Sequence, residues 1–346
     1  MRKLYLIVLL PLLTLWSCDV HEWPELPEAV KLHLCLDYET DMTEWEYIYD
    51  GLNEIEQGLG DTYDNRCGSG TMRYVVRTYP VSSHDYVQEF VFTKDIANGY
   101  KHEVTLDVLP GNYNVMVWSD LVAPGSNSNF YNTSNFAEIS LQGTHTGNTN
   151  YRDAFRGSND ILLKVDVVEK LPDTLHITMQ RPLAKFEFIT SDLQEFIIKE
   201  ATRLSRAGAN DVESAEDAAT RFVNIEDYRV VFYYAGFMPY AYNIHADKPV
   251  DSKTGVFFES KIDALNDNEA SLGFDYVLVN GVKSHVAIQI GLYDKANTRI
   301  ASSNPINVPL QRDRHTIMRG SYLIEQASGG IVINPEFDGE HNIIIP

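Results

Sequence analysis

The stretch VKLHLCLDY, residues Val30–Tyr38, decides the class of fold. Apolar side chains stand at every second position of this stretch, and polar residues or cysteine stand between them. Successive side chains of a β-strand point to opposite faces of a sheet, so this alternation predicts a strand with one buried face. The same period recurs in Tyr113–Trp118 and His285–Tyr293. The sequence therefore predicts a mainly β protein.

Further strands are predicted at short intervals along the chain. They are 74–79, 86–92, 103–108, 161–168, 175–179, 183–189, 228–234, 255–260, 272–279, 306–310 and 316–322. The polar stretches 39–70 and 124–159 are predicted as long loops. Short strands separated by frequent turns are typical of antiparallel β-sandwiches.

Arg181-Pro182 marks a predicted boundary, because proline cannot donate a hydrogen bond within a sheet. We expect two tandem β-sandwich domains, an N-terminal one over 30–180 and a C-terminal one over 181–346. One short helix is predicted near 192–206 in the second domain. Its apolar residues recur at helical spacing, and Ser191 and Gln194 have the spacing of a capping box.

Two turns are predicted to close β-hairpins. Pro110-Gly111 separates two alternating runs, and these residue types favour a tight turn because proline fixes φ and glycine leaves it free. Asn280-Gly281 stands between two further runs and is the strongest short hairpin signal in the chain.

The first 29 residues resemble the leader and tether of a bacterial lipoprotein. A basic start precedes an apolar run over residues 4–16, which is too short for a membrane span and typical of a signal peptide. Leu15-Trp16-Ser17-Cys18 resembles a lipobox. This resemblance implies removal of residues 1–17, acylation of Cys18 by chains such as palmitate, and a surface location on the cell outer membrane. The alternative is an ordinary secretory signal. Residues 18–29, acidic and proline-containing, are expected to form an extended tether.

Composition and charge exclude several classes of protein. The 346 residues are 44% hydrophobic and 11% aromatic, which excludes a disordered chain. Removal of Arg2 and Lys3 with the leader leaves 26 basic and 49 acidic residues, a formal charge of −23. Such a charge argues against nucleic acid as a partner, because nucleic-acid binding needs clustered Lys and Arg.

Cysteine chemistry leaves two alternatives open. Beyond Cys18 the chain has Cys35 and Cys67. In an oxidising compartment these two form a candidate disulfide that would stabilise the fold by roughly 3 kcal/mol. Two free thiols are the other alternative, since Cys35 stands on the outward-facing register of its strand.

Catalytic signatures are absent from the sequence. It lacks the nucleophile elbow, the metalloprotease helix, the phosphate loop and the EF-hand spacing. We therefore expect no enzyme activity, no cofactor and no metal site. Trp23, Trp45 and Trp118, together with the many tyrosines, allow a glycan-stacking surface, although aromatic residues on alternating strand positions more often belong to a core.

Several segments together resemble the fimbrillin-like lipoproteins of Bacteroidales. They are Leu109–Asp120, Arg181–Phe186, Tyr228–Pro239, Gly273–Gly281, Asn304–Pro309 and Ser328–Gly339. The resemblance implies two transthyretin-like sandwiches and a role in adhesion or in type V fimbriae, with other fimbrial subunits as partners. It also implies a candidate processing site at Arg66, because an Arg-specific cut there would release the first strand. The short tether favours an anchor or accessory subunit over a shaft subunit, and a surface glycan-binding lipoprotein is the alternative function.

Overall fold

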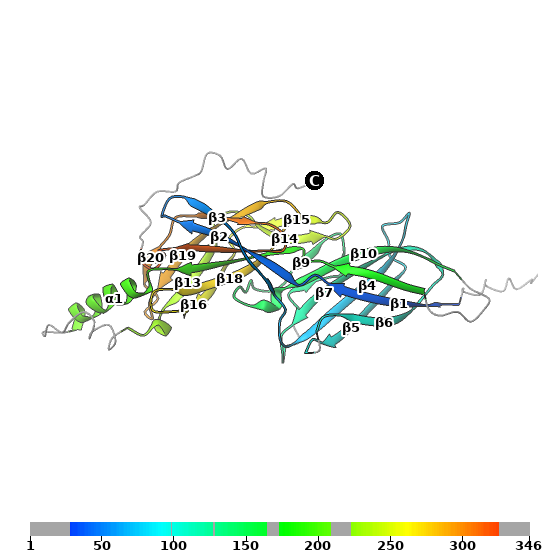
Figure 1. Ribbon diagram of the computed structural model, residues 1–346, viewed down its shortest axis with the longest axis horizontal. Coiled ribbons are helices and arrows are strands. Elements are labelled where there is room, and N and C mark those ends of the chain that lie inside the picture. Colours follow the sequence, from blue (N-terminus) through cyan, green and yellow to red (C-terminus); the bar gives the residue numbers. More distant parts are fainter. Residues whose placement is uncertain (1–27, 98, 127–128, 165–172, 209–222, 325–346) are drawn as a thin grey trace, which may run out of the picture.

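The fold was analysed in a computed structural model, which describes residues 28–97, 99–126, 129–164, 173–208 and 223–324. The molecule is elongated (Figure 1): β1 (Val30–Tyr38) lies toward one end and the helix α1 (Leu193–Gly208) lies at the other. Apart from α1 and two short 3₁₀ turns, η1 (Asn150–Arg152) and η2 (Ile225–Asp227), the described elements are strands. The prediction of a mainly β protein is confirmed.

The first sandwich contains a three-stranded and a four-stranded sheet. The three-stranded sheet has the order β11-β1-β6, with β6 (His102–Val108) and β11 (Asp173–Met179) on the two sides of β1. The four-stranded sheet has the order β10-β7-β4-β5. Its strands are β4 (Thr71–Pro80), β5 (Gln88–Asp95), β7 (Gly111–Val122) and β10 (Ala154–Leu163).

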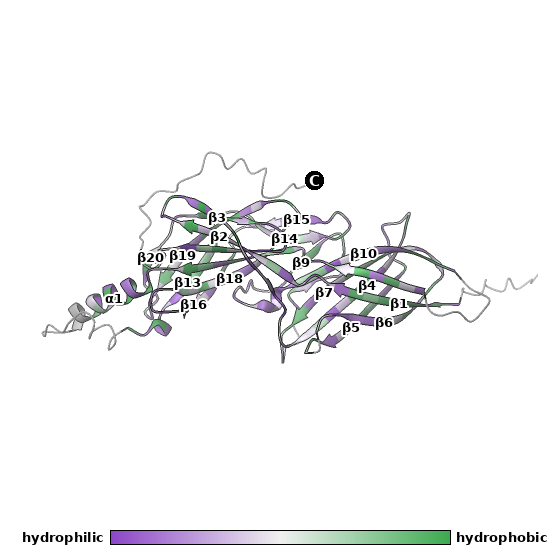
Figure 2. Cartoon of the chain, in the orientation of Figure 1, coloured by the Kyte–Doolittle hydropathy of each residue, from purple (hydrophilic) through white to green (hydrophobic). Residues whose placement is uncertain are grey.

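One hydrophobic core joins these two sheets. Leu32, Leu34 and Leu36 of β1 are fully buried, as are Val115 and Val117 of β7, and all five belong to the same cluster. The alternating apolar side chains of β1 face the opposite sheet, as the sequence predicted. Figure 2 shows hydrophobic and hydrophilic residues along the same strands.

The second sandwich contains a six-stranded and a five-stranded sheet. The six-stranded sheet has the order β17-β18-β12-β22-β2-β3, formed by β2 (Asp41–Tyr49), β3 (Glu54–Asp64), β12 (Leu183–Thr190), β17 (Asp263–Ala264), β18 (Ala270–Leu278) and β22 (Arg314–Gly320). The five-stranded sheet has the order β16-β13-β19-β20, with a further strand, β21, also paired to β19. Its strands are β13 (Arg229–Tyr234), β16 (Phe257–Lys261), β19 (Ser284–Tyr293), β20 (Arg299–Ser302) and β21 (Ile306–Leu310).

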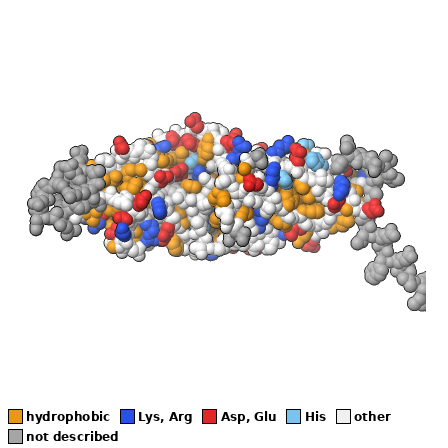
Figure 3. Space-filling model, turned by 90° about the horizontal axis from the view of Figure 1, so that it is seen from below, with side chains coloured by type: hydrophobic (Ala, Val, Ile, Leu, Met, Phe, Trp, Pro, Cys, Tyr) orange, Lys and Arg blue, Asp and Glu red, His pale blue; other side chains and the backbone are white. Residues whose placement is uncertain are grey.

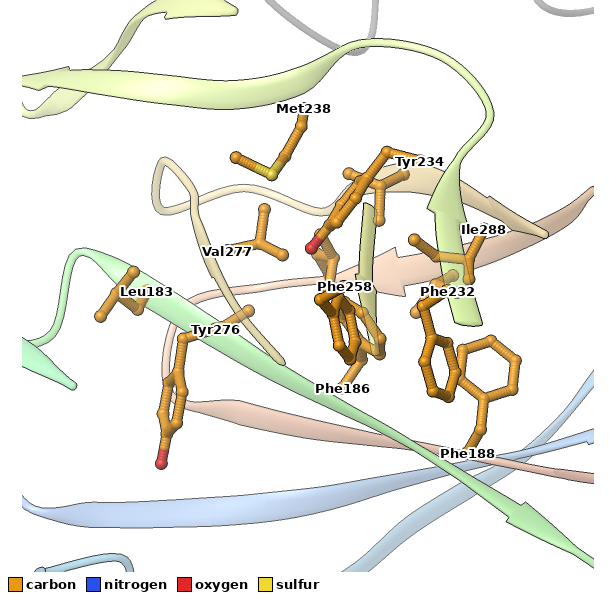
Figure 4. Close-up of a cluster of buried hydrophobic side chains, with 14 of the residues drawn as sticks. Leu183, Phe186, Phe188, Phe232, Tyr234, Met238, Phe258, Tyr276, Val277 and Ile288 are labelled. Atoms are coloured by element: carbon orange, nitrogen blue, oxygen red, sulfur yellow. The ribbon is translucent and has the colours of Figure 1, made fainter. Parts of the chain in front are cut away.

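Aromatic side chains fill the space between these two sheets. Figure 4 shows Phe186 and Phe188 of β12 directed toward Phe232 of β13 and Phe258 of β16. Phe232 stacks on Phe258 with ring centroids 4.7 Å apart, and the Phe188 centroid lies 5.6 Å from that of Phe232. Large rings in such contact contribute strongly to core stability.

A fifth sheet, of four strands, combines segments from both halves of the sequence. Its order is β15-β14-β9-β8, formed by β8 (Tyr131–Asn132), β9 (Ile139–Leu141), β14 (Met238–Asn243) and β15 (Lys248–Lys253). The β9–β14 pairing joins Ser140 to Ala241. Residues 124–159, predicted as a loop, therefore contain two short strands and the beginning of β10.

The prediction that residues 39–70 form a loop is wrong. Trp45, Tyr47 and Tyr49 of β2 are buried at every second position, but Glu44 and Glu46 beside Trp45 make the segment look polar. In β3 the pairing with β2 is interrupted by two register shifts, which weaken any periodic signal. Both strands extend the six-stranded sheet and leave only a short loop before β4.

The sheets cross the predicted boundary at residue 180. β2 lies in the first half of the sequence, yet it pairs in parallel with β22, so Trp45 stands opposite Thr316. The division into domains over 30–180 and 181–346 stays a prediction. The expectation of purely antiparallel sheets is corrected, because β1 with β11, β12 with β22, and β2 with β22 are parallel pairs.

Both predicted hairpins are also corrected. β6 pairs with β1, whereas β7 pairs with β4 and β10, so the turn at Pro110-Gly111 takes the chain from one sheet to the other. The turn at Asn280-Gly281 likewise joins β18 of one sheet to β19 of the opposite sheet. A tight turn fixes a change of direction, and whether it closes a hairpin depends on which sheet has room for the next strand.

The helix α1 occurs where it was predicted, but its start differs from a capping box. The Ser191 hydroxyl donates to the backbone carbonyl of Gly320 at 3.3 Å and does not cap the helix. The Asp192 carboxylate instead accepts the backbone N–H groups of Leu323 and Ile324, each at 3.1 Å. The first residues of α1 are therefore fixed to the segment that follows β22.

Candidate functional site

The site that bears on function is the joint between the two sandwiches, together with the strand that leads into it. β1 is the central strand of its sheet, paired with β11 on one side and β6 on the other. Only Glu39 and Thr40 separate it from β2, which lies in the second sandwich. The chain thus passes from one sandwich to the other within two residues.

The buried side chain of Arg181 holds the β1–β2 connection in place. Its side chain has no exposed area, and its guanidinium lies 4.7 Å from the centre of the Phe155 ring. Nε donates to both carboxylate oxygens of Asp153, at 2.9 and 3.0 Å, and Nη1 donates to the backbone carbonyls of Glu39 and Asp41. One buried cation therefore holds the β1–β2 connection, the chain before β10 and the chain before β12 together.

A second buried group of charges lies beside the first. The Asp275 carboxylate of β18 contacts Arg152 at 3.2 Å, His145 at 2.7 Å and the Tyr234 hydroxyl at 2.7 Å. Burial alone would raise the pKa of Asp275, but Arg152, His145 and the Tyr234 hydrogen bond more than offset it and lower that pKa. The ionised carboxylate thus connects a loop of the first half of the sequence to the second sandwich.

A continuous hydrophobic core crosses the joint as well. Trp118 of β7 is fully buried and contacts Tyr131 of β8 and Tyr242 of β14, with ring centroids 5.3 and 6.4 Å apart. These residues belong to the same cluster as Phe186 and Phe232 of the second sandwich. Buried ion pairs add little net stability but fix one arrangement, because any other leaves charges unpaired. The joint therefore contains both paired buried charges and a shared hydrophobic core.

The attachment residue Cys18 lies outside the described residues. Cys35 and Cys67 are both free cysteines in the structure. Cys35 lies in β1 between β6 and β11, and burial raises the pKa of its thiol. In the loop after β3, the backbone N–H of Cys67 donates to the Tyr100 hydroxyl at 2.7 Å.

Arg66 lies in the short loop between β3 and β4, with about half of its side chain exposed. Its Nε donates to the Asp64 carboxylate at 2.5 Å. A cut after Arg66 would separate β1 from the rest of the chain, as the sequence predicted, and it would separate β2 and β3 as well.

Of the tryptophans named for glycan stacking, Trp23 lies outside the described residues, and neither Trp45 nor Trp118 can serve that purpose. Trp118 has no exposed area, and Trp45 is 5% exposed. The Trp45 indole N–H donates to Glu56 at 2.9 Å, and the Lys283 ammonium lies 4.4 Å from its ring centre. The core interpretation of both residues is correct.

Sequence reasoning used Arg181 only as a boundary marker and did not single out Arg152, Asp153 or Asp275. The sequence pattern that could have indicated a buried cation was a basic residue directly before Pro182, beside apolar residues. No three His, Cys, Asp or Glu side chains gather as a metal site within the described ranges. Nor do those ranges contain a helix with the length and apolar character of a membrane span.

A family model matches residues 27–346, nearly the whole chain. The chain belongs to the family of unknown function DUF6562. No curated protein matches the sequence significantly.

Several solved structures resemble this member of DUF6562. A DUF1812 protein from Bacteroides thetaiotaomicron, described as a candidate polysaccharide-binding protein, is 10% identical, with 79% of this chain and 80% of that chain covered at a TM-score of 0.41. A candidate adhesin from Bacteroides ovatus is 13% identical, with 81% and 82% covered and a TM-score of 0.40. The fimbrial anchor protein Mfa2 from Porphyromonas gingivalis is 10% identical, with 79% and 82% covered and a TM-score of 0.38. At TM-scores below 0.5 these similarities do not by themselves assign a function.

Proposed function

We propose that this DUF6562 protein is a cell-surface lipoprotein that acts in adhesion or as an anchor or accessory subunit of a fimbria-like assembly. The observation that supports this most directly is the position of β1. It lies toward one end of an elongated molecule and continues within two residues into the second sandwich. A chain held through Cys18 would present α1 and the second sandwich away from the membrane. Both sandwiches would be tethered through this one residue.

Surface charge agrees with this role. Acidic and basic side chains are interspersed over the face in Figure 3, without a continuous basic area that would favour nucleic acid or anionic lipid headgroups. Attachment to the outer membrane would then depend on the acyl chains, each buried methylene contributing about 0.8 kcal/mol. We further propose that the protein has no enzyme activity and that its fimbrillin-like resemblance reflects common ancestry.

Acylation is tested by expressing the full chain in a Gram-negative host supplied with a clickable palmitate analogue. We expect the wild-type protein to be labelled, to fractionate with the outer membrane and to be accessible to external protease. The variant Cys18→Ser should lose the label and the membrane association, whereas the control Cys67→Ser should retain both. An unlabelled wild-type protein would disprove the lipid anchor.

Assembly is tested by mixing the purified mature protein with fimbrial subunits encoded by neighbouring genes. A complex on native gels, before or after trypsin cleavage at Arg66, would support the anchor or accessory role. Failure to form any complex under both conditions would remove the fimbrial part of the proposal. The second candidate function, surface glycan binding, is favoured by a cavity away from Trp45 and Trp118.

A further inference from the structure

An open cavity of about 680 Å³ lies where the first sandwich meets the sheet β15-β14-β9-β8. Three segments far apart in the sequence form its wall: the end of β4 with the turn to β5, the loop between β8 and β9, and the turn between β14 and β15. The wall residues include Arg77, Tyr79, His84, Tyr86, Asn135, Asn243 and His245.

The segments of the wall are fixed to one another. The backbone N–H of Ile244 donates to the carbonyl of Phe136 at 2.9 Å, which joins the β14–β15 turn to the β8–β9 loop. Arg77 donates from Nη2 to the carbonyls of Thr133 and Ser134 and so joins that loop to β4. The cavity therefore has a formed shape in the absence of any ligand.

Aromatic rings line one side of this cavity. Tyr86 is 44% exposed, and the Arg77 guanidinium lies 4.5 Å from its ring centre and 4.3 Å from that of Phe136. Tyr79 lies edge-to-face with Tyr86 and with His245, at centroid distances of 6.1 and 4.7 Å. An exposed ring supported in this way offers a fixed apolar surface for stacking.

Polar groups that can both donate and accept hydrogen bonds surround these rings. The ring nitrogens of His84 and His245 have no hydrogen-bond partner among the described residues, and their rings lie 6.3 Å apart. The side-chain oxygens of Asn135 and Asn243 accept backbone N–H groups of their own turns, so each amide nitrogen is available to donate to a ligand. Amides and neutral imidazoles complement hydroxyl groups, which also donate and accept.

The cavity lacks an uncompensated fixed positive charge. The Arg77 guanidinium is paired with Glu89 at 2.5 Å. Burial, followed by the neighbouring His84 and Arg77, lowers the pKa of His245, so that this imidazole is neutral at neutral pH. Asp85 is the one carboxylate among the described wall residues. These charges disfavour an anionic ligand.

We infer that this cavity binds a neutral glycan, with a pyranose ring stacked on Tyr86 and its hydroxyl groups hydrogen-bonded by His84, His245 and the two asparagine amides. A fixed aromatic face beside a few converging polar groups is the general form of a small-ligand site. The inference extends the proposed surface role by naming a ligand class, and it rests on that role only for its biological setting.

The inference is tested with the purified mature chain carrying Cys18→Ser, so that the result is independent of the lipid anchor. The probes are arrays of neutral gluco-, galacto- and manno-oligosaccharides beside uronic-acid oligosaccharides, followed by calorimetric titration of the strongest neutral binder. We expect binding to a neutral glycan. Tyr86→Ala and His84→Ala should each weaken it about tenfold or more, because both side chains are exposed and in direct contact with the ligand.

Matched variants separate a stacking site from a general loss of structure. Tyr86→Phe keeps the ring and should bind within about twofold of the parent protein. Phe257→Ala removes another exposed aromatic ring, 50% exposed on β16, and should not change binding. Equal binding by Tyr86→Ala, binding of uronic acids alone, or no glycan binding at all would overturn the inference while leaving the Cys18 test unaffected.

Discussion

At the scale of single residues, Arg181 shows how the joint is held. A guanidinium without exposed area has lost all its contacts with water, and its protein partners must replace them. The Asp153 carboxylate supplies the countercharge, and the carbonyls of Glu39 and Asp41 accept further hydrogen bonds. Those carbonyls belong to the β1–β2 connection. The buried Arg181–Asp153 pair therefore also fixes the backbone of that connection.

Arg181→Met should lower the free energy of unfolding by about 3–5 kcal/mol, because it leaves the Asp153 carboxylate buried without a partner. Urea denaturation followed by tryptophan fluorescence measures this. Adding Asp153→Asn to the variant removes the stranded charge and should recover part of the loss. As a control, Lys31→Met in the exposed pair with Asp107 should leave the urea midpoint unchanged, and an equal loss in both variants would contradict this account.

Asp313 should make stability depend on pH. It lies at the joint with a φ of 58°, and burial raises the pKa of its carboxyl from 3.8 to about 6. A group whose pKa is higher in the folded state stabilises the fold below its unfolded pKa, and this contribution is lost as the pH rises through the folded value. The protonated Asp313 carboxyl therefore stabilises the folded state below about pH 4, and this contribution is lost above about pH 6.

Asp313→Asn should accordingly raise the melting temperature by a few degrees at about pH 8, and this advantage should shrink as the pH falls toward about 4. Asparagine suits the positive φ as well as aspartate does, so the backbone is not strained. Thermal unfolding at a series of pH values measures the difference between the two proteins. A difference that is independent of pH would show that the carboxyl does not titrate as described.

At the scale of elements, β1, β2 and β3 form one N-terminal unit that is divided between two sandwiches. β1 is paired on both sides, and β2 is paired with β22 and β3. The loop at Arg66 is the first connection beyond this unit, and its exposure makes it accessible to protease. The unit can thus be separated covalently while its hydrogen bonds remain.

Brief trypsin treatment should cut after Arg66 and leave the N-terminal fragment bound to the remainder. Size-exclusion chromatography should then give one native peak, and a denaturing gel of that peak should show two fragments. In urea the fragments should separate. Arg66→Gln should abolish this cleavage pattern, and release of the fragment without denaturant would mean that β1 and β2 are held less firmly than their pairings indicate.

The limits of sequence reasoning are clearest at this scale. Alternation located β1, β7 and β19, because their apolar side chains at every second position are buried against a facing sheet. The turns at Pro110-Gly111 and Asn280-Gly281 were also located. The sheet entered after each turn was not predicted, since a turn signal is local and strand pairing is not. β2 was missed because Asp41, Glu44 and Glu46 make its sequence look polar, and the buried Arg152–Asp275 contact joins residues that no local pattern relates.

At the scale of the whole molecule, the two sandwiches should unfold as one unit. β2 and β3 join the second sandwich, and one hydrophobic cluster includes Trp118 from the first sandwich and Phe232 from the second. Scanning calorimetry of the mature protein should therefore show one transition, with equal calorimetric and van't Hoff enthalpies. Two separate transitions, in the intact protein and at any pH between about 6 and 8, would contradict this coupling.

The pairing of β1 with β11 and of β2 with β22 also limits the order in which parts of the fold can form during synthesis. Leu32 stands opposite Asp173, and Trp45 stands opposite Thr316, so the first strands to be synthesised pair with partners that follow more than a hundred residues later. Contacts between such distant residues form slowly, because a long loop must close before they stabilise anything. Until residues 314–320 have been synthesised, β2 and β3 have no strand that connects them to β12 and β18 of the six-stranded sheet. We therefore expect this sheet to be completed late, whereas all strands of the first sandwich precede residue 180.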